Sequence, residues 1–368
     1  METGTMTAGR AQPLAVASGK QHFAILDGLR GIAAIVVVIF HFMEVVFTDY
    51  SKNFAGHGFL AVDFFFCLSG FVIAYAYDDR MATLGLRDFF RARLIRLHPL
   101  VVLGAVLGLL TFLLDPLMGP PAGYGFGKTA LLFATTLLMI PFPIIAERYF
   151  NLFCLNAPAW SLFWEYIANI FYALILWRLR RNVLLIVALA AAVILGFTAY
   201  RAGNLMGGWS KDSFWDGGAR LFYSFTAGML VYRFRLIIPN RLGFPGVTLL
   251  LLAGLLMPYF PLNWLAEVLV VVFYFPLLVA LGAGARLVPT LEKPCSFSGK
   301  LSYPLYMTHY GFIWIFAHYL EQYKPDMSTL AVVIPVSTLV LIGIGWLAMV
   351  AYDQPVRNYL SRHRRNKK

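Results

Sequence analysis

A single histidine lies inside the first long apolar run of the chain, residues 24–48. This residue, His41, follows Arg30 by eleven positions. Eleven residues of α-helix leave a rotation of only about 20°, so the two side chains share one face about 16 Å apart. Ionisable residues inside a membrane span are expensive and usually functional, and a neutral histidine can act as general base toward a hydroxyl. The spacing therefore predicts His41 as a catalytic base.

A histidine base needs a partner that orients its ring. Glu44 lies three residues further along the same run, and Asp63 lies in the next apolar run beside three phenylalanines. Glu165 is a third candidate, in the motif Trp160-Ser161-Leu162-Phe163-Trp164-Glu165, where Ser161 and Glu165 share a helix face. The sequence leaves the three acids open as partners. Asp63 also fits a membrane-edge acid in contact with water.

Asp27 lies on nearly the same stripe as Arg30 and His41. Two interpretations of this stripe are open. Asp27 and Arg30 could belong to a site that binds an anionic substrate, or they could pair at the membrane interface while His41 hydrogen-bonds a neighbouring helix.

An arginine cluster, Arg87, Arg91, Arg93 and Arg96, precedes His98 and Pro99. Arg93 and Arg96 are one helical turn apart, so both can point at one anion, and arginine suits phosphate through its two-pronged guanidinium. The alternative is an ordinary positive loop on the cytoplasmic side, in contact with anionic lipid. Composition alone favours that alternative.

A second aromatic motif is Ser302-Tyr303-Pro304-Leu305-Tyr306-Met307-Thr308-His309, in which Tyr303, Tyr306 and His309 form a stripe. His309 could line a tunnel for a donor substrate, or hydrogen-bond another helix. The sequence supports both interpretations equally.

The elements that must position these residues are membrane spans. Of the 368 residues, 60% are hydrophobic and 13% are charged, against about 25% charged in a soluble domain. The net charge of +12 would suggest nucleic acid in a soluble protein, but in a membrane protein basic loops set the orientation, so no nucleic-acid partner is expected. The three cysteines have neither metal-site spacing nor a disulfide pattern, so no metal is expected. We predict an all-α polytopic membrane protein.

Charge decides how many apolar segments cross the membrane. Ten spans bring every basic loop to the cytoplasmic side if the segment near 129–146, with Pro141 and Pro143 at its far end, is re-entrant or interfacial. The basic stretch 78–96 is expected to form an amphipathic interfacial helix. The predicted organisation is a cytoplasmic tail at 1–22 without a signal peptide, a membrane domain at 23–356 and a basic cytoplasmic tail at 357–368. The eleven segments considered are 24–48, 58–77, 97–115, 129–146, 160–178, 183–200, 217–233, 244–258, 262–281, 301–320 and 329–352.

Five of these motifs, in this order, resemble the signature of the acyltransferase 3 family of membrane O-acyltransferases. They are the run from Ile25-Leu26-Asp27-Gly28-Leu29-Arg30-Gly31 through His41, the segment Asp63 to Gly70, Arg93-Leu94-Ile95-Arg96, Trp160 to Glu165, and Phe297-Ser298-Gly299-Lys300-Leu301-Ser302-Tyr303 to His309. Asp353-Gln354-Pro355 also resembles the acid-x-proline of the family, and the likeness covers about residues 23–360. Phe163 and Trp164 depart from it, because smaller residues often stand there.

The resemblance implies ten spans and transfer of an acyl group, usually acetyl from acetyl-CoA, onto carbohydrate hydroxyls. It implies roles for Arg30 and His41, and it implies that Arg93 and Arg96 hold the CoA phosphates. We therefore expect a multi-pass protein of the bacterial inner membrane with both termini in the cytoplasm. Its expected partners are acyl-CoA, an extracytoplasmic glycan or glycolipid, and membrane lipids.

Catalytic candidates are then His41, Asp63, Glu165 and Glu44, and donor-binding candidates are Arg30, Asp27, Arg93, Arg96, His309 and Tyr303. His41 could act as base for direct transfer, or could carry the acyl group in a two-step route. Two other functions fit the residues: an acyltransferase for a small molecule such as a macrolide, or, from a different class, a flippase for a lipid-linked sugar.

Overall fold

Helices account for nearly all regular structure in the computed structural model, which describes residues 22–119 and 123–365. Within these ranges, pairing between extended segments is limited to two isolated bridges, Asn151 with Ser210 and Asn240 with Ala285. The first eight helices are α1 (Ala24–Val46), α2 (Ala61–Tyr77), α3 (Met81–Leu84), α4 (Leu86–Leu113), α5 (Phe126–Leu137), α6 (Ala159–Leu174), α7 (Arg181–Ala202) and α8 (Phe214–Arg233). The others are α9 (Gly243–Leu255), α10 (Asn263–Leu269), α11 (Phe275–Gly284), α12 (Pro289–Thr308), α13 (Tyr310–Tyr323), α14 (Met327–Leu347) and α15 (Gln354–Arg365).

Long apolar helices make the chain a multi-pass membrane protein. Six helical segments in the described part of the chain are long and apolar enough to cross a bilayer, since about 20 residues of helix span roughly 30 Å of hydrocarbon. The count of ten spans stays a prediction. The six segments are Ala24–Val46, Gly58–Tyr77, Leu86–Leu113, Arg181–Ala202, Asn263–Gly284 and Met327–Arg362.

The segment near 129–146 is helical only in its first part. Helix α5 has 12 residues, which gives a length of about 18 Å, too short to cross the hydrocarbon layer. An irregular stretch follows from Leu138 to the start of α6, interrupted by one 3-10 turn at Ala146–Arg148. This geometry is compatible with the predicted re-entrant or interfacial segment.

Two predicted helix boundaries are wrong. The stretch 78–96 is not a separate interfacial helix, because α4 starts at Leu86, directly after Gly85 with φ of 76°, and continues through Pro99 to Leu113. The predicted span 301–320 is not one helix either. It is divided at His309 into α12, which ends at Thr308, and α13, which starts at Tyr310.

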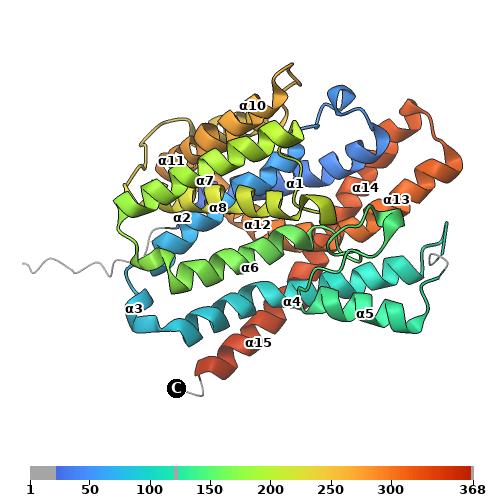
Figure 1. The fold of residues 1–368 in the computed structure, drawn as a ribbon, viewed down its shortest axis with the longest axis horizontal. Coiled ribbons are helices and arrows are strands. Elements are labelled where there is room, and N and C mark those ends of the chain that lie inside the picture. Colours follow the sequence, from blue (N-terminus) through green and yellow to red (C-terminus); the bar gives the residue numbers. More distant parts are fainter. Residues whose placement is uncertain (1–21, 120–122, 366–368) are drawn as a thin grey trace, which may run out of the picture.

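Close helix packing holds the centre together, with α1 against α12 and α2 against α8 as the most extensive helix pairs. A Cβ atom on Gly70 would lie 2.0 Å from the carbonyl oxygen of Phe225, and one on Gly228 would lie 1.8 Å from that of Cys67. Only glycine permits this approach of α2 to α8, as small residues commonly do between membrane helices. Figure 1 shows α1 and α2 among α7, α8 and α12.

The last described residues form a helix, α15 (Gln354–Arg365). Helix α15 includes most of the predicted tail 357–368 and contacts α4, and the two lie together at one edge of the bundle (Figure 1). Most of the predicted tail 1–22 lies outside the described residues.

Candidate active site

His41 and Glu44 form a local pair on α1. They are three residues apart, so they share a face of the helix, and Nδ1 of His41 lies 2.5 Å from Oε1 of Glu44. The hydroxyl of Tyr50 lies 3.5 Å from the other carboxylate oxygen of Glu44. If Glu44 accepts a hydrogen bond from Nδ1–H, the lone pair of Nε2 is free to take a proton. Nε2 is not sealed off within the protein, so the arrangement suits a general base.

The ring of His41 packs between two residues at the α12–α13 break. His309 stacks on it with a centroid distance of 5.3 Å, and Tyr310 meets it edge-on at 4.8 Å. Nδ1 of His309 lies within hydrogen-bonding distance of the carbonyl oxygens of Leu305 and Tyr306, at 3.1 and 2.9 Å. These carbonyls belong to its own helix α12, and Nε2 of His309 is buried without a hydrogen-bond partner among the described residues. The predicted hydrogen bond to another helix is therefore not seen, and His309 lines neither of the cavities described below.

A cavity of about 420 Å³ opens beside His41 and Glu44. We call it the His41 cavity. Most of its wall is apolar or aromatic, which suits a sugar ring or an acyl group. The aromatic residues that line it are Phe40, Tyr50, Phe59, Tyr149, Trp160, Trp209, Tyr306, Tyr310 and Trp314.

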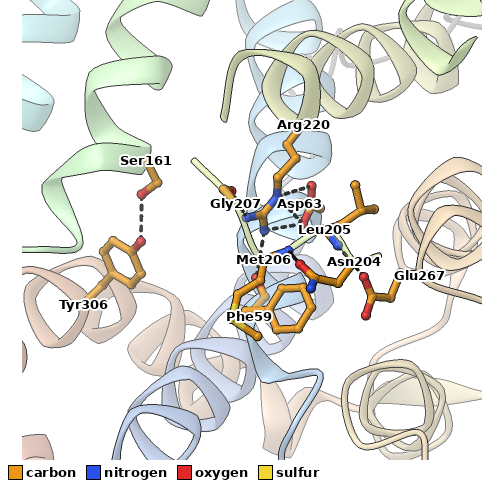
Figure 2. A network of polar contacts seen from close by, with 10 residues as sticks. All are labelled: Phe59, Asp63, Ser161, Asn204, Leu205, Met206, Gly207, Arg220, Glu267 and Tyr306. Atoms are coloured by element: carbon orange, nitrogen blue, oxygen red, sulfur yellow. Dashed lines mark hydrogen bonds and ion pairs between the residues drawn. The ribbon is translucent and has the colours of Figure 1, made fainter. Parts of the chain in front are cut away.

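Asp63 does not orient His41, because it pairs with Arg220 of α8. Nη2 of Arg220 lies 2.6 Å from Oδ2 of Asp63, and Nε lies 3.2 Å from both carboxylate oxygens. Arg220 also donates to the carbonyl oxygens of Phe59 and Gly207, and its side chain and that of Asp63 are 1% and 0% exposed. Figure 2 shows this network. A buried ion pair with several further hydrogen bonds holds its two helices together. Removing one partner from such a pair typically lowers the stability of the fold by about 3–5 kcal/mol.

The loop that contains Gly207 is tied to α10. The backbone N–H of Leu205 donates to Oε2 of Glu267 at 2.5 Å, and that of Met206 donates to Oδ1 of Asn204 at 2.9 Å (Figure 2). Met206 lines the His41 cavity. The Asp63–Arg220 pair therefore joins α2 and α8 to one wall of that cavity.

A second cavity, of about 180 Å³, brings together three of the predicted donor-binding arginines: Arg30, Arg93 and Arg96. We call it the arginine cavity. Arg30 donates to the carbonyl oxygen of Gly299 at 2.7 Å and to Oγ of Ser302 at 3.1 Å, both on α12. These bonds fix one of the three guanidinium groups in place.

Glu165 lies in the arginine cavity and pairs with Arg93. Nη2 of Arg93 lies 2.9 Å from Oε1 of Glu165, which also accepts a hydrogen bond from Oγ of Ser69 at 3.2 Å. Glu165 is therefore not the residue that orients His41. Its carboxylate holds the Arg93 side chain instead.

Tyr303 and Asp27 each contact one of the arginines. The hydroxyl of Tyr303 donates to the carbonyl oxygen of Leu97 at 2.7 Å, and Arg96 lies over its ring at 5.8 Å. Asp27 forms an ion pair with Arg30 at 3.1 Å and does not line the cavity. This contact matches the predicted interfacial pairing of Asp27 with Arg30, but His41 has a local partner of its own.

The two cavities share two wall residues, Val62 and Tyr306. The hydroxyl oxygens of Tyr306 and Ser161 lie 2.7 Å apart, as Figure 2 shows. The His41 cavity and the arginine cavity are therefore neighbours, with a thin wall between them. Among the described residues, no group of three or more His, Cys, Asp or Glu could hold a metal ion.

Residues 23–350 match the family model of the acyltransferase 3 domain, described as an acyltransferase domain. The chain belongs to this family. "Protein 2 in picA locus" of Rhizobium radiobacter is 35% identical over 190 residues, which cover 48% of this chain and 95% of that protein. No solved structure matches the chain. The family and the apolar helices together make the protein a membrane acyltransferase.

Two relatives in Staphylococcus aureus match a shorter segment of this acyltransferase 3 member. Each is named "Putative O-acetyltransferase", in strains COL and MSSA476, and each is 39% identical over 94 residues. That segment covers 24% of this chain and 14% of either relative. The chain thus spans a small part of these longer proteins.

Sequence reasoning overlooked two arginines that line the His41 cavity, Arg220 and Arg148. Arg220 lies inside the apolar run 217–233, so the argument applied to His41, that a charge within a span is expensive, would have singled it out. Arg148 follows a proline-interrupted segment and precedes Tyr149, and no pattern in the sequence marks it.

Proposed function

We propose that the protein transfers an acyl group, most simply acetyl, from cytoplasmic acyl-CoA to a hydroxyl of an extracytoplasmic glycan or lipid-linked sugar. The observation that carries the proposal is the adjacency of the arginine cavity and the His41 cavity across Val62 and Tyr306. One cavity suits an anionic donor, and the other offers a base beside a largely apolar space.

The donor side is supported by clustered guanidinium groups. Arg30, Arg93 and Arg96 supply charge-assisted hydrogen bonds of the kind that bind phosphate. A third cavity, of about 530 Å³, shares Arg96 with the arginine cavity and is also lined by Lys300 and Arg357. In this proposal the nucleotide end of CoA rests on these basic groups, and its pantetheine arm runs past Tyr303 toward Tyr306.

The acceptor side is supported by the His41–Glu44 pair. In direct transfer, Nε2 of His41 takes the hydroxyl proton as that oxygen bonds to the thioester carbonyl carbon. The carbon–sulfur bond then breaks, and the leaving CoA sulfur takes the proton from the imidazolium, giving an ester and free CoA. Glu44 stabilises the transient positive charge on His41. In the two-step route, Nε2 attacks the thioester carbonyl carbon, the carbon–sulfur bond breaks and CoA leaves as the thiolate. The hydroxyl oxygen then attacks the acyl carbon, the bond from that carbon to Nε2 breaks, and the hydroxyl proton ends on the CoA sulfur.

A transfer assay with reconstituted protein tests the proposal. With radiolabelled acetyl-CoA and a glycan extract from the native host, wild-type protein should label the glycan. His41→Ala should lower the rate by about 10²- to 10⁴-fold, the usual contribution of a general base. His318→Asn is a matched control, because His318 pairs with Asp115 at 2.6 Å and lines neither cavity.

Two outcomes would sink the proposal. One is full transfer activity in the His41→Ala variant, in protein shown to be inserted and monodisperse. The other is the lack of any acetyl-CoA binding to the wild-type protein, which would instead favour a sugar flippase, since a flippase has no use for this donor.

A further inference from the structure

Two buried arginines line the His41 cavity. One forms an ion pair with a carboxylate and the other does not. Arg220 is neutralised by Asp63 through three close N–O contacts. Arg148 is 6% exposed, and among the described residues no carboxylate forms an ion pair with it. Asp115 is paired with His318 instead, at 2.6 Å. Arg148 is therefore a buried cation in this cavity without an acidic partner.

Aromatic rings hold the guanidinium of Arg148 in place. Its Cζ atom lies 4.8 Å from the ring centroid of Phe112 and 4.9 Å from that of Trp314. Cation–π contacts of this kind lower the cost of a buried charge, but they do not use the N–H donors. Nη1 donates to the carbonyl oxygen of Cys154 at 2.5 Å, which leaves most of the five donors of the side chain unused.

The unused donors of Arg148 are accessible. Its Nε and Nη2 atoms make no hydrogen bond within the described structure, and neither is sealed off from solvent. Arg148 itself lines the His41 cavity, so its side chain is in reach of a molecule that occupies the cavity. A fork of free donors beside a buried positive charge fits a carboxylate or a phosphate oxygen pair.

The backbone around Arg148 is fixed in a strained form. The next two residues, Tyr149 and Phe150, both have left-handed conformations, with φ of 55° and 50°. Such conformations in residues other than glycine cost free energy and gather at functional sites. Hydrogen bonds from Leu152 to Trp209, at 2.9 Å, and from Lys211 to Phe150, at 3.1 Å, tie the segment to the loop before α8. The position of Arg148 is therefore set by the fold.

Arg148 and His41 line the same cavity and are linked along its wall by two aromatic residues. His41 meets Tyr310 at 4.8 Å, the ring of Tyr310 lies 6.1 Å from that of Trp314, and Trp314 lies 4.9 Å from Arg148. A saccharide in the cavity could contact Arg148 while one of its hydroxyls lies near His41.

We propose that the acceptor of this enzyme is an acidic saccharide, and that Arg148 binds its anionic group while the aromatic wall contacts its rings. This inference rests on the proposed function and narrows its acceptor class. The anionic group is either a carboxylate, as in a uronic acid, or a phosphate. Arg148 would bind either group, and the probes below distinguish the two.

Binding and transfer measured separately test this proposal. The probes are a glucuronic-acid disaccharide, the same disaccharide with its carboxyl reduced to an alcohol, and a neutral disaccharide carrying one phosphate. Binding to reconstituted protein is followed through the fluorescence of the cavity tryptophans Trp160, Trp209 and Trp314, and transfer by the acetyl-CoA assay. Wild-type protein should bind at least one acidic probe about 10- to 100-fold more tightly than the reduced probe, the range of a charge-assisted hydrogen bond.

Three variants complete the design. Arg148→Gln should abolish the preference for the acidic probe, and Arg148→Lys should retain part of it, since the charge stays but the fork is lost. Arg201→Gln is the matched control. Arg201 pairs with Asp216, is largely exposed and does not line the cavity, so the preference should persist.

Equal binding of acidic and reduced probes to the wild-type protein would overturn the proposal, and so would a preference that survives Arg148→Gln. A wild-type protein that prefers the acidic probe but never acetylates it would instead refute the acyltransfer function and leave the anion site standing. Even if Arg148→Gln fails to fold, comparing the acidic and reduced probes on the wild-type protein tests whether the acceptor is an acidic saccharide.

Discussion

Nδ1 of His41 and Oε1 of Glu44 lie 2.5 Å apart on the same face of α1. The proposed base and the acid proposed to orient it therefore belong to one helix, and their relative position does not depend on how neighbouring helices pack. Movements of other helices during turnover would leave this pair intact.

Replacing Glu44 with Gln should lower the rate of acyl transfer by about 10²-fold or more, because an amide can neither fix the neutral tautomer of His41 nor stabilise its imidazolium form. The affinity for acetyl-CoA should stay near that of the wild type. Steady-state kinetics with saturating donor would measure this. Tyr50→Phe is a milder control, since its contact with Glu44 is 3.5 Å long. A Glu44→Gln variant with full kcat would disprove the orienting role.

Glu165→Gln should act on the donor and not on the chemical step. Glu165 holds Arg93 at 2.9 Å, so its loss frees one of the three guanidinium groups that we propose to bind the CoA phosphates. We expect the KM for acetyl-CoA to rise about 5- to 50-fold, as for a lost charge-assisted hydrogen bond, with a small change in kcat. Arg93→Ala should give the same pattern. A fall in kcat at unchanged KM would instead make Glu165 part of the reacting centre.

The Asp63–Arg220 pair should stabilise the fold because each buried charge neutralises the other. Asp63→Leu or Arg220→Met alone should lower the stability by about 3–5 kcal/mol, because each leaves an uncompensated buried charge. The double variant Asp63→Leu with Arg220→Met should recover much of that loss. Thermal unfolding in detergent would measure the four states of this cycle. Additive losses in the double variant would show that the two residues act independently.

The wall at Tyr306 should separate the thioester from water in the neighbouring cavity. Tyr306→Ala removes a residue common to both cavities, so hydrolysis of acetyl-CoA without acceptor should increase by at least several-fold. Tyr306→Phe removes only the hydrogen bond of 2.7 Å to Ser161 and should have a smaller effect, whereas Ser161→Ala also removes the hydrogen bond of 3.0 Å to the carbonyl oxygen of Pro158. Release of free CoA is the readout. An unchanged hydrolysis rate in Tyr306→Ala would mean that the wall does not limit access.

Relationships within one helix could be predicted from the sequence, and relationships between helices could not. The shared face of Arg30 and His41 and the proximity of Glu44 follow from helical phase alone. Asp63 and Arg220 are 157 residues apart, and Arg93 and Glu165 are 72 apart. One sequence does not say which helices are neighbours, so the partners of these two acids stayed open.

The break at His309 and the role of Arg148 also lacked a local signal. No glycine or proline lies at positions 308–310, so the apolar run there predicts an uninterrupted span. In contrast, the resemblance correctly identified the family, because its motifs are recognisable in the sequence. The three arginines that it singled out line one cavity, and their role in donor binding stays a prediction.

The thin wall of Val62 and Tyr306 has a further consequence under the proposed function. The bulky, charged donor would stay on one side of the bilayer and the glycan on the other, so that only the acyl group itself crosses. The side chains of Val62 and Tyr306 would then separate the two compartments at this point. The cell would acylate glycans outside the membrane without exporting the acyl-CoA itself.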